Sequence, residues 1–270
     1  MLNKKIFIEA SKGVATGASM LIPGVSGGTM AIILGFYDKL ISAVSSFFKD
    51  PKKNFITLLI YGGSIGLGIL IFANFLLFVT NNFPMPMMYL FTGAVLGSIP
   101  MLYKKTGLKV FPIRNIIFPL LGIAIVLLLD KLPTDLISFN AKMGLTEYII
   151  LIAAGVIIAI ALVLPGISVS YMLLVLGIYQ PTLQAIESFN FAFIIPLGLS
   201  VLLGVFITTR FLEYAMKKYS DATFLLIIGF VIASIKDIFP GLPSGLNIIT
   251  CILTFALGFA LILYISKFSD

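Results

Sequence analysis

Apolar runs of membrane-spanning length recur along this chain from one end to the other. A bilayer core about 30 Å thick needs roughly 20 apolar residues per helical span, and short turns with charge, proline or glycine separate the runs. With 60% hydrophobic residues, 11% charged residues and a mean hydropathy of +1.14, the chain has more apolar surface than one water-soluble core can bury. The sequence therefore predicts an all-α polytopic membrane protein.

The basic residues lie at the ends of the apolar runs and form no single basic face, so nucleic acid is not an expected partner. The positive-inside rule places most of the 18 lysines and arginines in the cytoplasm. On this assignment only Lys131, Lys142 and Lys236 lie outside. The cytoplasmic clusters are the two termini and residues 49–53, 104–114 and 210–218. We therefore expect a multi-pass protein of the cytoplasmic membrane with both termini in the cytoplasm.

The chain has no histidine and one cysteine, Cys251, which lies within an apolar run. A disulfide within the chain is excluded, and so are catalytic or metal sites built on histidine. We expect no metal and no cofactor, and we expect Cys251 to serve packing.

One pattern occurs twice in the sequence. The segment MLIPGVSGGTMAIILGFY aligns with LVLPGISVSYMLLVLGIY and pairs Pro23 with Pro165, an offset of 142 residues. Small residues farther along continue to match, as Gly62 does with Gly198 at an offset of 136 residues. A constant offset kept over a long stretch indicates internal duplication. The predicted divisions are a first repeat at 1–130, a linker at 131–145 and a second repeat at 146–270.

Each repeat is expected to contain two arms around a Pro-Gly break, followed by three spans. An odd number of crossings per repeat turns the second half upside down relative to the first. Two full crossings by the arms and a re-entrant hairpin both return the chain to the same side of the membrane, so the charge count leaves both possibilities open. Glu9 and Lys12 favour the hairpin, because charge at bilayer depth is costly. The expected fold is an inverted-topology repeat of about six transmembrane helices plus two re-entrant hairpins. The arms are 6–22, 26–47, 148–164 and 168–186, and the spans are 55–79, 87–103, 113–129, 193–216, 223–235 and 248–265.

The two Pro-Gly breaks are the candidate substrate site. Irregular backbone inside a membrane is tolerated only where protein or a water-filled cavity satisfies its polar groups. Proline ends a helix, glycine allows close approach of a ligand, and the start of the next helix offers hydroxyls, free N–H groups and a positive dipole to an anion. The alternative is that each Pro-Gly pair only kinks a packed helix. The candidate binding residues are Pro23, Gly24, Ser26, Gly27, Gly28 and Thr29 in the first break and Pro165, Gly166, Ser168 and Ser170 in the second.

Three charged residues add to this list. Lys12 is a candidate partner of an anion, with snorkelling or pairing to Glu9 as the alternative. Arg210 is a candidate ligand contact, with snorkelling at the inner end of a helix as its alternative. Glu9 is the acidic residue nearest a hairpin and the candidate carrier of a coupling proton.

The segment PGVSGGTMAIILGFYDKLI and its partner LPGISVSYMLLVLGIYQPTL resemble the bacterial polyprenyl-phosphate transporter family, formerly a membrane family of unknown function. The resemblance covers nearly the whole chain. It implies a flippase, and no enzyme, that returns undecaprenyl phosphate from the outer to the inner leaflet for carrier-lipid recycling in cell-envelope synthesis. The implied partners are polyprenyl phosphate, membrane lipids and a coupling proton or sodium ion.

Two other functions remain open from the sequence. The inverted repeat also suits a transporter of a small anionic solute. An integral-membrane undecaprenyl-diphosphate phosphatase has similar repeats, but here the turns read PGVSGG and PGISVS and lack the arginine of its PGxSRS-like turn. Glu9 also has no second carboxylate four residues on, where the chain has Gly13, so general acid/base work would lack its usual groups.

Overall fold

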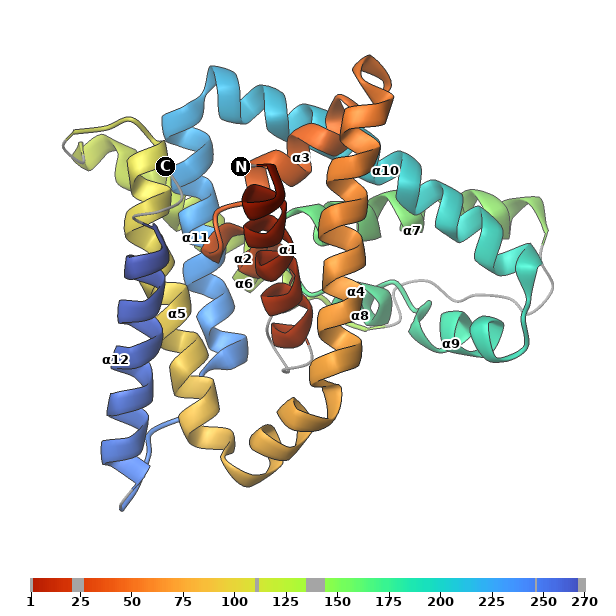
Figure 1. Ribbon diagram of the computed structural model, residues 1–270. Helices are drawn as coiled ribbons and strands as arrows, with labels where there is room; N and C mark the ends of the chain where they lie inside the picture. Colours follow the sequence, from red (N-terminus) through yellow and green to blue (C-terminus); the bar gives the residue numbers. More distant parts are fainter. Residues whose placement is uncertain (1, 21–26, 110–111, 135–143, 246, 267–270) are drawn as a thin grey trace.

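The computed structural model describes residues 2–20, 27–109, 112–134, 144–245 and 247–266, and every regular element in these ranges is a helix (Figure 1). The prediction of an all-helical protein is confirmed. The first half contains α1 (Leu2–Ser19), α2 (Gly27–Ile33), α3 (Tyr37–Ser45), η1 (Phe47–Lys49), α4 (Pro51–Asn82), α5 (Pro84–Lys105), η2 (Ile113–Ile116) and α6 (Ile117–Leu129). The second half contains α7 (Leu145–Val163), α8 (Val169–Val175), α9 (Tyr179–Glu187), α10 (Phe191–Lys218), α11 (Ser220–Ile238) and α12 (Asn247–Ser266).

Five of these helices are long and apolar enough to cross a membrane, namely α4, α5, α7, α10 and α12. The pairs α2–α3 and α8–α9 are apolar as units but bend by 118° and 106° at a short break. Helix α6 is apolar but has only 13 residues, and α11 carries charges near both ends around a buried middle. The six predicted spans are thus all helices, and the two bent pairs fit the predicted re-entrant hairpins.

The sharp bend of each pair lies within an arm, away from the Pro-Gly break that the sequence placed between the two arms. The arms 26–47 and 168–186 each split at a glycine with positive φ, Gly35 at 73° and Gly177 at 70°. The amide after Gly35 donates to the carbonyl of Ala31 at 2.9 Å, five residues back, and the amide after Gly177 bonds in the same way at 3.0 Å. This is the Schellman ending of a helix, for which a left-handed glycine is the usual residue. These glycines end their helices and thereby add a bend inside each arm that the sequence did not predict.

The two halves also repeat their helix packing. A Cβ on Gly13 of α1 would overlap the hydroxyl of Ser64 on α4, and a Cβ on Gly155 of α7 would overlap the hydroxyl of Ser200 on α10. The offsets of 142 and 136 residues found in the sequence relate these two contacts. Small residues therefore bring the helix axes close at equivalent places. That the two halves are inverted relative to a membrane stays a prediction.

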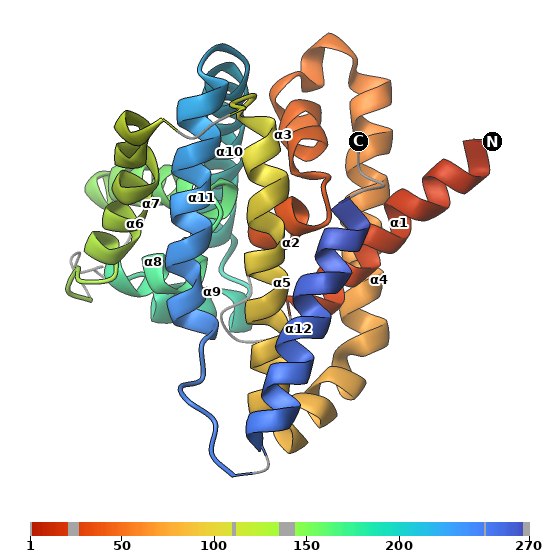
Figure 2. The same ribbon diagram turned by 90° about the vertical axis from the view of Figure 1, so that its left-hand side faces the viewer.

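The last helix of each half packs on the other half. Figure 2 shows α5 and α11 side by side, with α12 against α5 and α6 against α11. Gly93 of α5 meets the backbone of α12 at Phe255, and Gly229 of α11 meets the backbone of α6 at Pro119. The segments 1–130 and 146–270 are therefore not separate packing units.

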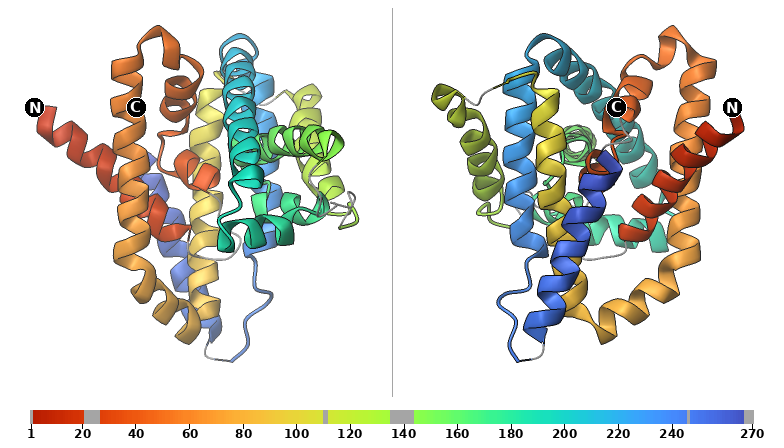
Figure 3. Two further views of the ribbon diagram at one scale, coloured as in Figure 1. Left: turned by 90° about the vertical axis from the view of Figure 1, so that its right-hand side faces the viewer. Right: turned by 60° about the vertical axis from the view of Figure 1, so that its left-hand side comes forward.

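The hairpin α2–α3 lies in the middle of the molecule. Ile33 and Phe36 are fully buried and belong to the largest apolar cluster, together with Val95 of α5 and Val231 of α11. Figure 3 shows the start of α1 and the end of α12 toward the upper part of the molecule, where α5 ends and α10 turns into α11. The regions expected to be cytoplasmic thus gather at one end, and α9 lies toward the other (Figure 1).

Candidate functional site

A cavity of about 950 Å³ lies between the two halves. Its walls are largely apolar, and both interrupted segments contribute to it through Gly27 and Gly28 of α2 and through Gly166, Ser168 and Ser170 around the start of α8. This volume is within the usual range for small-molecule sites, about 300–1,000 Å³. The two breaks predicted from the sequence therefore line one common space.

The two interrupted segments also contact each other directly. A Cβ on Gly28 would lie 3.7 Å from the Cα atom of Pro165, which is ordinary van der Waals contact. The buried Tyr37 hydroxyl of α3 donates a hydrogen bond of 2.7 Å to the carbonyl of Val163, the last residue of α7. That carbonyl has no partner within its own helix, so the first half caps a helix of the second half.

Gly166 holds the second break against α11. Its φ is +79°, and a Cβ there would overlap the carbonyl oxygen of Phe230. A side chain is thus excluded both by the left-handed backbone and by the close approach. This contact packs the backbone that lines the cavity directly on α11.

The predicted hydroxyls have different surroundings. Ser168 caps α8, because its oxygen accepts the amide of Tyr171 at 3.2 Å, and it lines the cavity together with the exposed Ser170. Thr29 is buried and is not part of the cavity lining. Helices α2 and α8 have only seven residues each, so they carry a smaller dipole than the sequence argument assumed. Side chains must therefore provide most of any attraction for an anion.

Three predicted site residues, Pro23, Gly24 and Ser26, lie outside the described residues. The start of α2 that follows them, at Gly27 and Gly28, lines the cavity.

The three charged candidates lie away from the cavity lining. Glu9 forms an ion pair of 2.5 Å with Lys39 of α3 and accepts a hydrogen bond from the buried Tyr61 of α4. Lys12 is half-buried on α1, one turn from Glu9. The guanidinium of the exposed Arg210 lies 4.9 Å from the ring centre of Phe206.

Four polar lining residues of the cavity, near the ends of α6 and α11 and the start of α8, form a group that the sequence did not predict and that we call the polar rim. Lys236 of α11 forms an ion pair of 2.9 Å with Asp130, at the end of α6. The Tyr171 hydroxyl of α8 donates to the backbone carbonyls of Asp130 and Leu132 at 2.8 and 3.0 Å. Asp237 completes this polar rim. From the sequence, Lys236 was expected only to lie on the outer side, because no sequence pattern shows that the end of α11 meets the end of α6.

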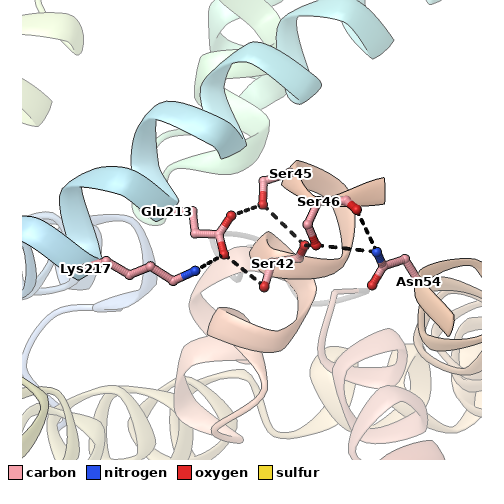
Figure 4. Close-up of polar contacts among 6 residues, drawn as sticks. All are labelled: Ser42, Ser45, Ser46, Asn54, Glu213 and Lys217. Atoms are coloured by element: carbon pink, nitrogen blue, oxygen red, sulfur yellow. Dashed lines mark hydrogen bonds and ion pairs between the residues drawn. The ribbon is translucent and has the colours of Figure 1, made fainter. Parts of the chain in front are cut away.

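A second polar cluster joins α3 to α10 (Figure 4). Glu213 accepts hydrogen bonds from Ser42, at 3.0 Å, and from Ser45, and it pairs with Lys217 at 2.5 Å. The cluster ties α3, the second helix of the first hairpin, to the long helix α10. It is not part of the cavity lining.

Comparison with known proteins decides the family. Residues 16–249 match the model of the family described as VCA0040-like, undecaprenyl phosphate translocase-like. The chain belongs to this family.

Two relatives carry the same name. The polyprenyl-phosphate transporter of Staphylococcus aureus is 32% identical over 97% of this chain and 96% of its own length. The polyprenyl-phosphate transporter of Vibrio cholerae is 28% identical over 85% of this chain and 76% of its own length. No solved structure matches the chain. The resemblance stated from the two Pro-Gly segments is confirmed, and the family is one of multi-pass membrane transporters and not of enzymes.

Proposed function

We propose that this protein moves undecaprenyl phosphate or a related polyprenyl phosphate across the cytoplasmic membrane, for recycling of the carrier lipid in cell-envelope synthesis. The observation that carries the proposal is the cavity between the two halves, which both interrupted segments line and whose lining includes the polar rim. Its apolar walls suit the first part of a polyprenyl chain, and its polar groups suit a phosphate. The rest of the chain can remain in the bilayer.

The proposed mechanism is alternating access to this cavity. The two hairpins enter from opposite faces in the inverted arrangement, so that small movements of one half against the other open the cavity to each side in turn. The gathering of the basic termini and loops at one end supports a cytoplasmic location for that end. The rim of the cavity then faces outward.

Coupling to a proton or a sodium ion is part of the proposal. A phosphate monoester carries about −1.5 to −2 charges, and inward movement against the membrane potential costs about 2.3 kcal/mol per charge per 100 mV. A co-transported cation offsets this cost. Glu9 remains the candidate carrier, and its pairing with Lys39 and Tyr61 means that cation binding has to displace an existing partner.

The test is leaflet transfer of undecaprenyl phosphate in proteoliposomes that contain the purified protein. We expect transfer above that of protein-free vesicles and a reduced rate for Ser26→Ala. Lys12→Ala and Arg210→Ala test whether these two side chains, which are not part of the cavity lining, contact the headgroup. Unchanged rates in all three variants would contradict that site assignment while leaving the transport activity standing. Absence of transfer by the wild-type protein would contradict the proposed function.

The same vesicles separate this function from transport of a small anion. An excess of inorganic phosphate should not inhibit transfer of the lipid, because the polyprenyl chain contributes to binding. Inhibition by inorganic phosphate, together with its uptake into the vesicles, would favour the small-anion alternative.

A further inference from the structure

The cavity contains a single basic side chain among its described lining residues, Lys236. We propose that Lys236 docks the phosphate headgroup at the outer rim of the cavity, and that Asp130 holds this lysine until the headgroup replaces it. The inference rests on the proposed function and names a binding residue of the same site.

The ion pair between Lys236 and Asp130 is weak enough for a phosphate to replace the aspartate. The lysine side chain is 59% exposed and the aspartate side chain 23% exposed, at a separation of 2.9 Å. Exposed ion pairs of this kind hold their partners weakly. A phosphate with more charge and three acceptor oxygens competes well for the ammonium group.

Other cations near the two hairpins are engaged away from the cavity. Lys39 pairs with Glu9, Lys105 with Asp38 and Lys217 with Glu213, and none of these lysines lines the cavity. An anion that enters the cavity at the rim therefore meets Lys236 as its basic partner, beside the carboxylates of Asp130 and Asp237. The nearby lining serines, Ser168 and Ser170, add hydroxyls on the α8 side.

Hydrogen bonds between neighbouring elements hold the backbone around the rim. The Tyr171 hydroxyl ties α8 to the end of α6 through two carbonyl oxygens. Beyond Lys236, the Tyr89 hydroxyl of α5 donates to the carbonyl of Gly241 at 3.0 Å and its ring packs against Phe239. These contacts hold the end of α6, the start of α8 and the segment after α11 in place, so only side chains need to move when the partners exchange.

The experiment measures binding of undecaprenyl phosphate to the full-length protein in detergent micelles. Undecaprenol, which lacks the phosphate, and inorganic phosphate, which lacks the chain, separate the contributions of headgroup and tail. Lys236→Gln should weaken lipid-phosphate binding by about tenfold, as expected for one charged hydrogen-bond donor, and leave undecaprenol binding unchanged. Lys236→Arg should retain most of the affinity. Lys131→Gln is the matched control, because this exposed lysine at the same end is not part of the lining.

Asp130→Asn should increase the affinity for the lipid phosphate, which a misfolded variant would not do. Removal of the competing carboxylate should tighten lipid-phosphate binding by about threefold, because the exposed pair is weak, and this gain should vanish in the Lys236→Gln background. If Asp130→Asn still increased affinity in the Lys236→Gln background, the exchange of Asp130 for the headgroup would be overturned. Asp130 would then act only by repelling the anion. Equal binding by wild type and Lys236→Gln would overturn the docking role while the proposed function stands. Failure of the wild-type protein to bind the phosphate lipid at all would count against the proposed function itself.

Discussion

Gly166 shows how one residue connects the predicted break to the observed cavity. The sequence marks it only as half of a Pro-Gly pair, whereas the structure gives it a φ of +79° and places it against the carbonyl of Phe230. The backbone that lines the cavity is thereby packed on the central helix α11. Close to this break, the Tyr37 hydroxyl caps the end of α7 by donating a hydrogen bond to the carbonyl of Val163.

Replacement of Gly166 by alanine tests this role. We expect Gly166→Ala to lower stability by about 1–3 kcal/mol for the strained backbone alone, with a further loss from the overlap with Phe230. Thermal unfolding in detergent measures the change. The control is Gly198→Ala in α10, where a Cβ meets nothing within 4 Å and helix propensity favours alanine. Equal stability of the two variants would contradict the packing described for the second break.

At the scale of elements, the hairpins are defined by two equivalent helix endings. Each short helix, α2 and α8, ends in a Schellman turn, and the next helix then leaves at a large angle. The sequence shows both glycines, because LGFY and LGIY occur at the same offset as the Pro-Gly breaks. Their spacing within apolar runs is also compatible with an uninterrupted helix, so the local pattern alone did not reveal the bend.

Gly35→Ala and Gly177→Ala should therefore have similar effects. Each places a Cβ in a left-handed conformation, at φ of 73° and 70°, which costs about 1–2 kcal/mol. Thermal unfolding of the two single variants checks the magnitude, and Gly63→Ala in α4, where a Cβ has open space, is the control. Stabilisation by either substitution would mean that the bend at that position is not a left-handed turn.

At the scale of the whole molecule, the two halves depend on each other. Helix α12 packs on α5 and helix α6 packs on α11, with Gly93 and Gly229 at the equivalent contacts. Lipid provides no hydrophobic force between helices, so such close contacts through small residues stabilise the assembly. A half without its partner would leave α6 or α12 without the surface it packs against.

Expression of residues 1–138 and 139–270 as two chains tests this dependence. We expect the two fragments to copurify when they are produced together and to be degraded when each is produced alone. Copurification from detergent extracts and limited proteolysis measure both outcomes, with the unsplit protein as reference. A protease-resistant, monodisperse single half would contradict the exchange of helices between halves.

The sequence by itself determined the membrane environment and the helical class, and it predicted the duplication and a substrate site at the two Pro-Gly breaks. These features follow from local composition and from a constant offset, which a single chain displays directly. Only the tertiary structure decided that Lys236 and Asp130 meet, that Glu9 pairs with Lys39 and that the last helices exchange partners. Such contacts join residues far apart in the chain, and their formation depends on how close the small residues allow the helices to pack.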